Sequence, residues 1–270
     1  MNAEAQEGTL ARILEEASRR VAGLRPYAVA LERKAAAVRE PPDFVAALSG
    51  TDVAVIAEVK RRSPSAGALV PGGNAVRLAR AYAEAGAAAI SVLTEEKFFG
   101  GTLKDLSDVS SQVGLPVLRK DFVIDPVQAY EARAAGAAAL LLIARILSFE
   151  RLDELASLAR GIGLVPLIEV HNEEELRLAL RCAPAVVGIN SRDLDSLRVD
   201  PAVVTALLPQ VPRGVVAVAE SGIGNRSDVE HFAAHGADAV LVGTSVAGAA
   251  DPSEAVRSLV GVSRRAGARS

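Results

Sequence analysis

The chain has 270 residues, of which 50% are hydrophobic and 23% charged, and this suits one large globular domain because closed barrels of alternating strands and helices run to about 250 residues. Its formal net charge of −3 and pI near 5.8 come from mixed acids and bases. They exclude the strongly basic surface that binds a nucleic-acid backbone or an anionic membrane. We therefore expect neither partner.

Cysteine content and targeting signals further limit the class of protein. Cys182 is the one cysteine, which excludes an internal disulfide and a zinc site, so we expect it to be a packing residue. The longest apolar run, 134–144, is shorter than the roughly 20 residues that span a bilayer. The N-terminus lacks a basic-then-apolar signal pattern, and we expect a soluble cytoplasmic protein.

The first 50 residues precede the regular pattern of the rest of the chain. Apolar side chains at helical spacing predict a first helix, and they are Leu10, Ile13, Leu14, Ala17 and Val21. A second helical stretch follows, and then Pro41-Pro42. We expect 1–50 to be a helical extension packed on a barrel formed by 51–270, with one domain in all.

From residue 53 onward, short apolar runs alternate with amphipathic segments of about a dozen residues, which is typical of strand–helix–strand units with a parallel sheet. Eight runs are nearly all apolar, as strands covered on both faces should be. They are Val53–Glu58, Ala88–Leu93, Pro116–Arg119, Ala138–Ile143, Val165–Val170, Val186–Asn190, Val215–Ser221 and Ala239–Gly243. The sequence therefore predicts an α/β fold, a single (β/α)8 TIM barrel with an N-terminal helical extension.

Helix boundaries support this count. An N-capping aspartate precedes a proline at Asp125-Pro126, Asp200-Pro201 and Asp251-Pro252. Asn172 with Glu175 predicts a capping box. Glycines expected to end helices are Gly86, Gly136 and Gly236.

Active sites of such barrels lie at the carboxyl ends of the strands, where this chain places polar residues. Glu58 and Lys60 are two residues apart and so share one face of the first strand, with Ser63 in the loop beyond. Later strand ends carry Arg119-Lys120-Asp121-Phe122, Glu169-Val170-His171, Asn190-Ser191-Arg192 and Glu220-Ser221. Each alone could be a solvated ion pair or a structural acceptor, but their convergence on one rim favours a pocket.

Phosphate binding has its own pattern, because barrels often hold a phosphate with the loops after strands seven and eight. These loops read Ser221-Gly222-Ile223-Gly224 and Gly243-Thr244-Ser245, although each glycine alone could serve only a turn. Two misleading motifs lie nearby. The segment 222–227 is a broken dinucleotide-binding motif, and His231 with His235 has metal-pair spacing on an outer helix. We reject both and expect no metal.

Six segments then resemble one family. They are IAEVKRRSPSAG (56–67), SVLTEEKFFGGTL (91–103), LRKDFVID (118–125), LIEVHNEEEL (167–176), GINSRDL (188–194) and AESGI (219–223). They are similar to the successive signatures of the indole-3-glycerol-phosphate synthases, and the likeness runs from about residue 10 to the end. The resemblance implies a carboxy-lyase of tryptophan biosynthesis that acts without metal or cofactor. It would close the indole ring of 1-(2-carboxyphenylamino)-1-deoxyribulose 5-phosphate with loss of CO2 and water.

The resemblance also implies roles for the catalytic residues. Lys120 would be the general acid that protonates the keto oxygen, with its pKa brought toward working pH by a cationic site. Glu169 and Lys60 would carry the later proton transfers, with Glu58 as a base or an orienting residue. Asn190 would bind substrate oxygens and hold Glu169 in place. Ser221 completes the expected catalytic set.

Binding residues follow from the same resemblance. On the phosphate side we expect Gly222, Gly243, Thr244 and Ser245, with Lys60 also able to reach the phosphate. Arg192 or Lys60 would meet the substrate carboxylate or phosphate, and Ser63 and Glu220 would lie close to the reacting centre. An apolar slot for the anthranilate ring would be formed by Phe99, Phe122, Leu141 and Leu194, although core packing is the alternative reading of each leucine.

Three rivals remain at this point. One is another sugar-phosphate barrel such as a phosphoribosylanthranilate isomerase, which lacks the helical extension. A second is a Schiff-base aldolase, in which Lys120 would attack as a neutral amine. The third is a non-catalytic barrel scaffold. We expect a small phosphorylated substrate as partner and a monomer, with other tryptophan-pathway enzymes as further candidate partners.

Overall fold

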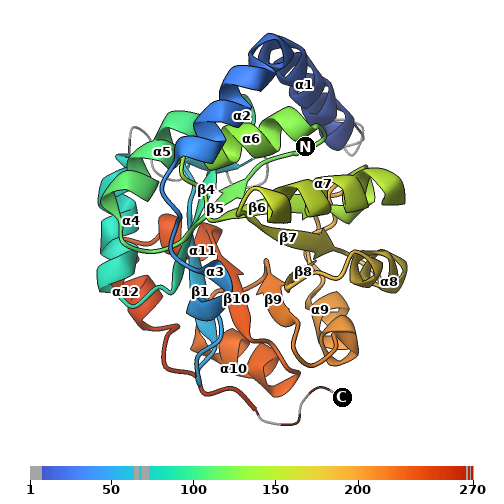
Figure 1. Cartoon of the computed structure of the whole chain (residues 1–270). Helices are drawn as coiled ribbons and strands as arrows, with labels where there is room; N and C mark the ends of the chain where they lie inside the picture. The colour runs from blue at the N-terminus through green and yellow to red at the C-terminus, as the bar shows by residue number, and fades with distance from the viewer. Residues whose placement is uncertain (1–7, 64–66, 69–72, 266, 268, 270) are drawn as a thin grey trace.

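The computed structural model describes residues 8–63, 67–68, 73–265, 267 and 269. Eight parallel strands form a closed barrel in the order β1-β10-β9-β8-β7-β6-β5-β4, so strands consecutive along the chain are neighbours (Figure 1). Their bounds are β1 Ala54–Val59, β4 Ala89–Leu93, β5 Val117–Lys120, β6 Ala139–Ile143, β7 Val165–Val170, β8 Val186–Asn190, β9 Val216–Glu220 and β10 Ala239–Val242. Each lies within one residue of the expected run at both ends. The predicted (β/α)8 barrel is confirmed.

Helices follow the strands and cover the outside of the barrel. They are α4 Ala75–Glu84, α5 Leu103–Gln112, α6 Pro126–Ala134, α7 Phe149–Gly161, α8 Glu173–Arg181, α9 Pro201–Leu207, α10 Arg226–Ala234, α11 Thr244–Ala247 and α12 Pro252–Arg257, with short 3-10 turns η3 Ala144–Ile146 and η4 Leu208–Gln210. The aspartate caps at 125, 200 and 251 are confirmed. Gly86, Gly136 and Gly236 adopt positive φ just past their helices, as predicted.

The expected capping box at Asn172 is wrong in one half. Asn172 caps α8, because its side chain accepts a hydrogen bond from the Glu175 backbone N–H. The Glu175 carboxylate, however, accepts from the backbone N–H of His171 at 2.8 Å and lies 3.0 Å from the His171 ring. The other Glu175 oxygen, Oε1, accepts from the Asn172 side-chain amide at 2.8 Å, so the Glu175 carboxylate contacts the cap residue through the Asn172 side chain and not through the Asn172 backbone N–H.

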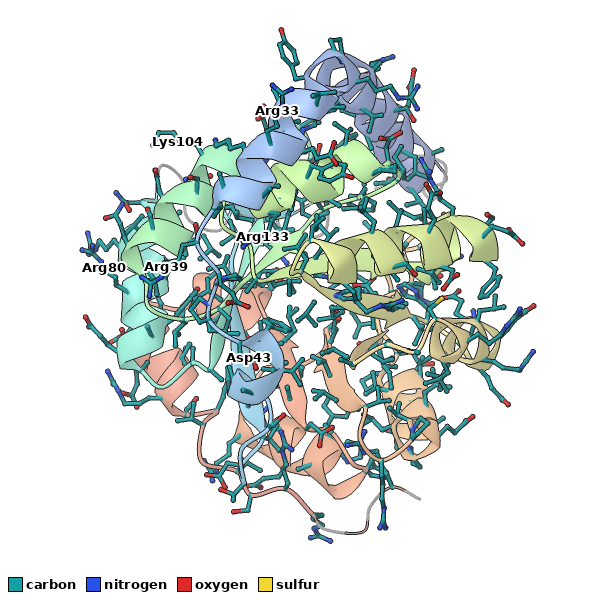
Figure 2. The ribbon with its side chains drawn as sticks, in the orientation of Figure 1. Arg33, Arg39, Asp43, Arg80, Lys104 and Arg133 are labelled. Carbon is teal, nitrogen blue, oxygen red and sulfur yellow. The ribbon has the colours of Figure 1, made fainter. Side chains whose placement is uncertain are left out.

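The N-terminal segment forms α1 Thr9–Leu24, the 3-10 turn η2 Arg25–Tyr27, α2 Ala28–Ala37 and α3 Phe44–Ala47. Ile13 and Val21 of the predicted stripe are buried. Helix α2 lies along α6 (Figure 1). Arg133 of α6 ties the end of α2 to the barrel by donating to the carbonyls of Val38 and Arg39 at 3.1 and 3.0 Å (Figure 2).

Side chains two residues apart on a strand point to the same side. A strand that contributes an apolar residue to the barrel core therefore places the residue two positions later at the cavity. One buried cluster holds inward-facing apolar residues of five strands, namely Ile56, Leu118, Leu167, Val218 and Leu241. Two residues farther along the same strands stand Glu58, Lys120, Glu169, Glu220 and Gly243. Charged groups therefore gather at one end of the barrel because they follow the core register.

Three further features complete the fold. Strands β2 Arg62–Ser63 and β3 Gly67–Ala68 pair antiparallel beyond β1, an element that the sequence analysis did not predict. Cys182 is buried at 2% exposure, consistent with a packing role. Within the described part of the chain, no helix is long and apolar enough to cross a membrane.

Candidate active site

A cavity of about 530 Å³ opens at the carboxyl ends of the strands. Of the residues expected at the site, those lining it are Glu58, Lys60, Phe99, Lys120, Phe122, Leu141, Glu169, Asn190, Arg192, Leu194, Glu220, Ser221, Gly222, Gly243, Thr244 and Ser245. Ser63 is the exception. It ends β2, and its side chain lies outside the described residues. The strand-end rule therefore gathers nearly the whole expected set around one cavity.

Lys120 sits between two carboxylates at the base of this cavity. Its Nζ lies 2.8 Å from Glu169 Oε2 and 3.0 Å from Glu220 Oε2, and its side chain is 13% exposed. Burial alone would lower the pKa of Lys120, but the charges of Glu169 and Glu220 outweigh burial and raise it. The expectation of a cationic site that lowers this pKa is therefore wrong. The two anions stand on β7 and β9, and sequence spacing alone could not predict how close they lie to Lys120.

The two carboxylates differ in charge although both contact Lys120. Burial opposes ionisation of Glu169, yet Lys120 and His171 together hold the pKa of its carboxyl well below the usual range. Burial raises the pKa of Glu220 to about 8, and the neighbouring charge of Glu169 adds to this effect. Lys120 and His171 thus favour the ionised form of Glu169, whereas burial and the charge of Glu169 favour the protonated form of Glu220.

His171 supports Glu169 from the side away from Lys120. Its Nε2 lies 3.3 Å from Glu169 Oε1, and its Nδ1 lies 3.0 Å from Glu175 Oε2. Burial would lower the pKa of His171, but these two carboxylates raise it to about 9. The sequence analysis placed His171 at the strand end without a role, although Glu169 two residues before it and Glu175 four residues after it were the available signal.

A second ion pair stands on β1. Lys60 Nζ lies 3.0 Å from Glu58 Oε1, and both side chains are largely buried, as the two-residue spacing predicted. Gly243 leaves the space that this pair occupies, because a Cβ there would overlap the Glu58 carboxylate. Gly188 makes the same room for Glu220. Both glycines are therefore required by the neighbouring acids.

Asn190 and Arg192 line the cavity from the end of β8. The Asn190 Oδ1 accepts a hydrogen bond from the Arg192 backbone N–H at 2.9 Å. That Asn190 holds Glu169 in place stays a prediction, because only its amide Nδ2 can donate to a carboxylate, whereas the turn after β8 uses its Oδ1. Burial lowers the pKa of Arg192, and its guanidinium donates to the Leu197 carbonyl at 2.8 Å.

The loops after β9 and β10 form the expected phosphate side. Ser221 has φ of 66° and Gly222 of 73°, so a non-glycine residue holds a left-handed conformation at the cavity wall. Ser245 Oγ donates to the Ile223 carbonyl at 2.8 Å and joins the two loops. Helix α11 begins at Thr244, and the first backbone N–H groups of a helix lack partners within that helix.

The opposite flank of the cavity is apolar. Phe99 and Phe122 have ring centroids 6.2 Å apart in a tilted arrangement, within the range of a favourable aromatic pair. Leu141 and Leu194 line the same cavity. A ligand with one aromatic and one anionic end would match the two flanks.

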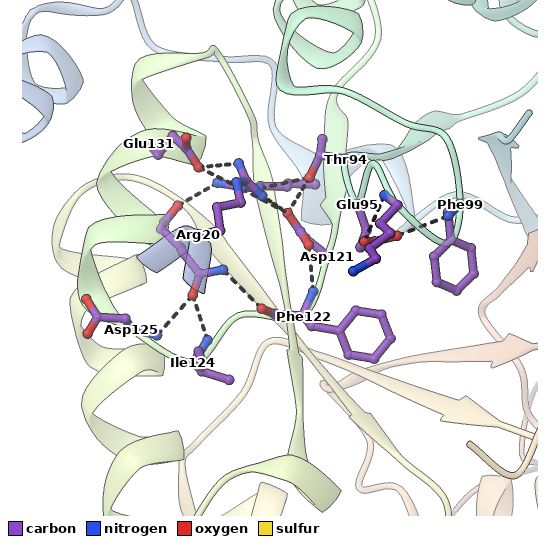
Figure 3. A network of polar contacts seen from close by, with 12 residues as sticks. Arg20, Thr94, Glu95, Phe99, Asp121, Phe122, Ile124, Asp125 and Glu131 are labelled. Atoms are coloured by element: carbon purple, nitrogen blue, oxygen red, sulfur yellow. Dashed lines mark hydrogen bonds and ion pairs between the residues drawn. The ribbon is translucent and has the colours of Figure 1, made fainter. Parts of the chain in front are cut away.

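Behind the apolar flank lies a buried polar network that sequence reasoning missed (Figure 3). Arg119 is fully buried and donates to Asp121 Oδ2 at 2.9 Å and to Glu131 Oε2 at 2.7 Å. Arg20 of α1 reaches the same two atoms, each at 2.7 Å. Burial opposes ionisation of Asp121, but Arg119 and Arg20 hold its pKa below the usual range. The sequence analysis noted Arg119 and Asp121 at a strand end. It could not identify their partners, because these lie elsewhere in the chain.

Comparison with known proteins identifies the family. A family model described as Indole-3-glycerol phosphate synthase matches residues 10–259. The chain belongs to the indole-3-glycerol phosphate synthase family. Indole-3-glycerol phosphate synthase 1 of Streptomyces coelicolor is 47% identical over 230 residues, which cover 85% of this chain and 86% of that relative. The Mycobacterium avium indole-3-glycerol phosphate synthase is 48% identical over 231 residues, which cover 85% of each chain.

Solved structures show the same fold at much lower identity. The 3-hexulose-6-phosphate synthase of Salmonella typhimurium superposes with a TM-score of 0.62 at 15% identity, and the match covers 77% of this chain and 96% of that chain. A thiamine phosphate pyrophosphorylase from Pyrococcus furiosus gives 0.57 at 19%, with 78% and 95% covered. These likenesses show a shared barrel, whereas the indole-3-glycerol phosphate synthase match contains every strand end that carries a site residue.

Proposed function

We propose that this chain is an indole-3-glycerol phosphate synthase, which closes the indole ring of 1-(2-carboxyphenylamino)-1-deoxyribulose 5-phosphate and releases CO2 and water. The observation that carries the proposal is the Lys120 ammonium, held at 2.8 and 3.0 Å by two carboxylates between an aromatic flank and a phosphate-type loop pair. The substrate has one aromatic ring, one keto group and one phosphate. The cavity offers a matching surface to each.

Lys120 is the proposed general acid. Its raised pKa keeps the side chain charged, so a proton is available for the keto oxygen as the anthranilate ring carbon attacks the keto carbon. A Schiff-base nucleophile must be a neutral amine, and the two carboxylates oppose that state. The aldolase alternative is therefore disfavoured by the charges that surround this nitrogen.

The protons taken up and released during the reaction determine how many acids and bases the site needs besides Lys120. Ring closure takes up one proton at the keto oxygen, and loss of CO2 leaves the electron pair in the ring system. Departure of the resulting hydroxyl as water takes up a second proton, and rearomatisation returns one. Glu169 is the proposed base because it is ionised, and Lys60 is the proposed second acid. Glu58, 3.0 Å from Lys60, orients it or serves as a base.

The remaining residues bind the substrate in this proposal. Phe99, Phe122, Leu141 and Leu194 form the slot for the anthranilate ring. The phosphate is bound by the loop residues Gly222, Gly243, Thr244 and Ser245, with Lys60 beside them. Arg192 meets a substrate anion, Asn190 and Ser221 bind substrate oxygens, and Ser63 and Glu220 lie near the reacting centre.

Further proposals concern the oligomeric state, the location in the cell and the domain organisation. We propose a monomer in the cytoplasm that acts on a small phosphorylated substrate, with residues 1–50 as an extension of the barrel domain 51–270. Support for the last point comes from the hydrogen bonds of Arg133 and Arg20 between these two parts. Neither nucleic acid nor membrane is a proposed partner.

Product formation from the synthetic substrate in EDTA tests this function, with the fluorescence of indole-3-glycerol phosphate as the signal. Phosphoribosylanthranilate is offered in parallel, since an isomerase would consume it. We expect indole product and CO2 from the first compound and no reaction with the second. Turnover of phosphoribosylanthranilate alone, or a borohydride-trapped adduct on Lys120, would overturn the assignment.

A further inference from the structure

The backbone N–H groups of the two cavity phenylalanines are each bonded to a buried carboxylate. Phe99 N–H donates to Glu95 Oε2 at 3.0 Å, and Phe122 N–H donates to Asp121 Oδ1 at 2.9 Å (Figure 3). Glu95 is 8% exposed and Asp121 is 4% exposed. The two acids follow the adjacent strands β4 and β5, so one arrangement is repeated on neighbouring strand ends.

Glu95 organises the whole segment that carries Phe99. Its Oε1 accepts from the Lys97 backbone N–H at 3.0 Å, and its Oε2 also accepts from the Phe98 N–H at 2.7 Å. Its own carbonyl accepts from the Gly101 N–H at 3.0 Å. Three backbone donors converge on one carboxylate, so the backbone that carries the Phe99 ring cannot shift without loss of charge-assisted hydrogen bonds.

Asp121 is held just as firmly. Its Oδ2 accepts from Thr94 Oγ1 at 2.6 Å and from the guanidinium groups of Arg119 and Arg20. Thr94 also donates its backbone N–H to the Lys120 carbonyl at 3.1 Å. The residue just before Glu95 is therefore bonded directly to Asp121, and the two carboxylates belong to one rigid unit.

Helix α1 supports this unit from the N-terminal extension. Arg20 reaches Asp121 as described above, while Glu16 lies 2.9 Å from Lys97 Nζ and the Arg12 guanidinium lies 5.6 Å from the Phe98 ring centroid. Three successive turns of one helix thus contact both segments. The extension is physically coupled to the aromatic flank.

We infer that Glu95 and Asp121 are positioning residues that set the separation of the Phe99 and Phe122 rings and thereby select a flat aromatic ring. This inference rests on the proposed function. Every carboxylate oxygen of both residues accepts a hydrogen bond from the loop or network that holds the two phenylalanines, which is the arrangement of a positioning residue. Their effect is on binding of the aryl half of the substrate.

The test uses separate probes for the two ends of the cavity. Anthranilate reports on the aromatic flank and inorganic phosphate on the opposite loops, each measured as a competitive inhibitor of turnover. Anthranilate binding is also followed directly by its fluorescence, which is convenient because the chain has no tryptophan and three tyrosines. The variants are Glu95→Ala and Glu95→Gln, with Glu96→Ala as the matched control because Glu96 is exposed on the same segment.

We expect Glu95→Ala to weaken anthranilate binding by roughly tenfold, the size of a lost aromatic contact. Glu95→Gln keeps some acceptor capacity and should give a smaller loss. Phosphate binding should change by less than about twofold, because that site is distant and shares no partner. The KM of the full substrate should rise more than kcat falls. Glu96→Ala should match wild type.

Arg20→Met probes the Asp121 arm, with Arg19→Met on the exposed face of α1 as its control. We expect a selective loss of anthranilate binding in the first variant alone. Equal losses for anthranilate and phosphate, or unchanged anthranilate binding in Glu95→Ala, would overturn the inference, as would wild type that fails to bind anthranilate. Circular dichroism melts identify any variant that does not fold. Wild type that binds anthranilate but forms no indole product would instead refute the proposed function.

Discussion

Replacement of His171 by glutamine should move the acid limb of the kcat profile to higher pH. The histidine cation lies 3.3 Å from Glu169 Oε1. Unit charges at this distance interact by about 5 kcal/mol at an effective dielectric constant near 20, which corresponds to roughly three to four pH units. Water that enters beside the shorter amide offsets part of this, and we expect the limb to move by about two to three pH units.

The direction of this pH shift follows from the ionisation state in which Glu169 acts. It acts as a carboxylate, and His171 lowers its pKa, so loss of this cation increases the protonated, inactive fraction at acid pH. Near pH 8 the variant should retain kcat within a few-fold. His231→Gln is the control, because His231 is exposed on α10. Superimposable profiles, or a loss of equal size at every pH, would refute this reasoning.

The same variant gives a stability readout. The pKa of His171 is raised from 6.5 to about 9, so its charge stabilises the fold fully below pH 6.5 and this contribution is lost as pH rises through 9. Its full size is about 3 kcal/mol. Urea unfolding should therefore show a gap between wild type and His171→Gln at pH 6 that closes by pH 10.

Three further predictions concern other side chains. Glu220→Gln should keep kcat at pH 7 within about tenfold, because the pKa of Glu220 near 8 already leaves it neutral, whereas Glu169→Gln should lose about 10²–10⁴, both by steady-state kinetics. Gly243→Ala should lower kcat by about 10², because the new Cβ displaces the Glu58 carboxylate. Arg119→Met removes one of the two guanidinium groups that Asp121 and Glu131 share, leaving Arg20, and should lower the free energy of unfolding in urea by about 2–3 kcal/mol.

Local rules accounted for the fold and for most of the cavity lining. Strands of a barrel are nearly all apolar and are separated by capped helices, so all eight were predicted to within one residue at each end. Closure of the barrel then brings their carboxyl ends together, as Lys120 and Glu169 illustrate. The β2–β3 pair was not predicted because its polar, proline-containing sequence carries no strand alternation.

Interactions between distant segments could not be predicted from spacing. The strand-end rule placed Glu169 and Glu220 on the same rim as Lys120, but it could not predict that both carboxylates contact the Lys120 ammonium, so the surroundings proved anionic rather than cationic. Asp121 owes its geometry to Arg20, about 100 residues earlier in the chain. Glu95 binds backbone N–H groups, which leave no trace in side-chain chemistry.

The general-acid role of Lys120 is tested most directly by Lys120→Ala beside wild type in EDTA, with the fluorescence of indole-3-glycerol phosphate as the signal. Lys104→Ala is the control, since Lys104 is 79% exposed and pairs with Asp108 on the same helix. We predict full activity for wild type and the control, and a loss of at least about 10² in kcat for Lys120→Ala. A folded Lys120→Ala variant with kcat near that of wild type would contradict the account.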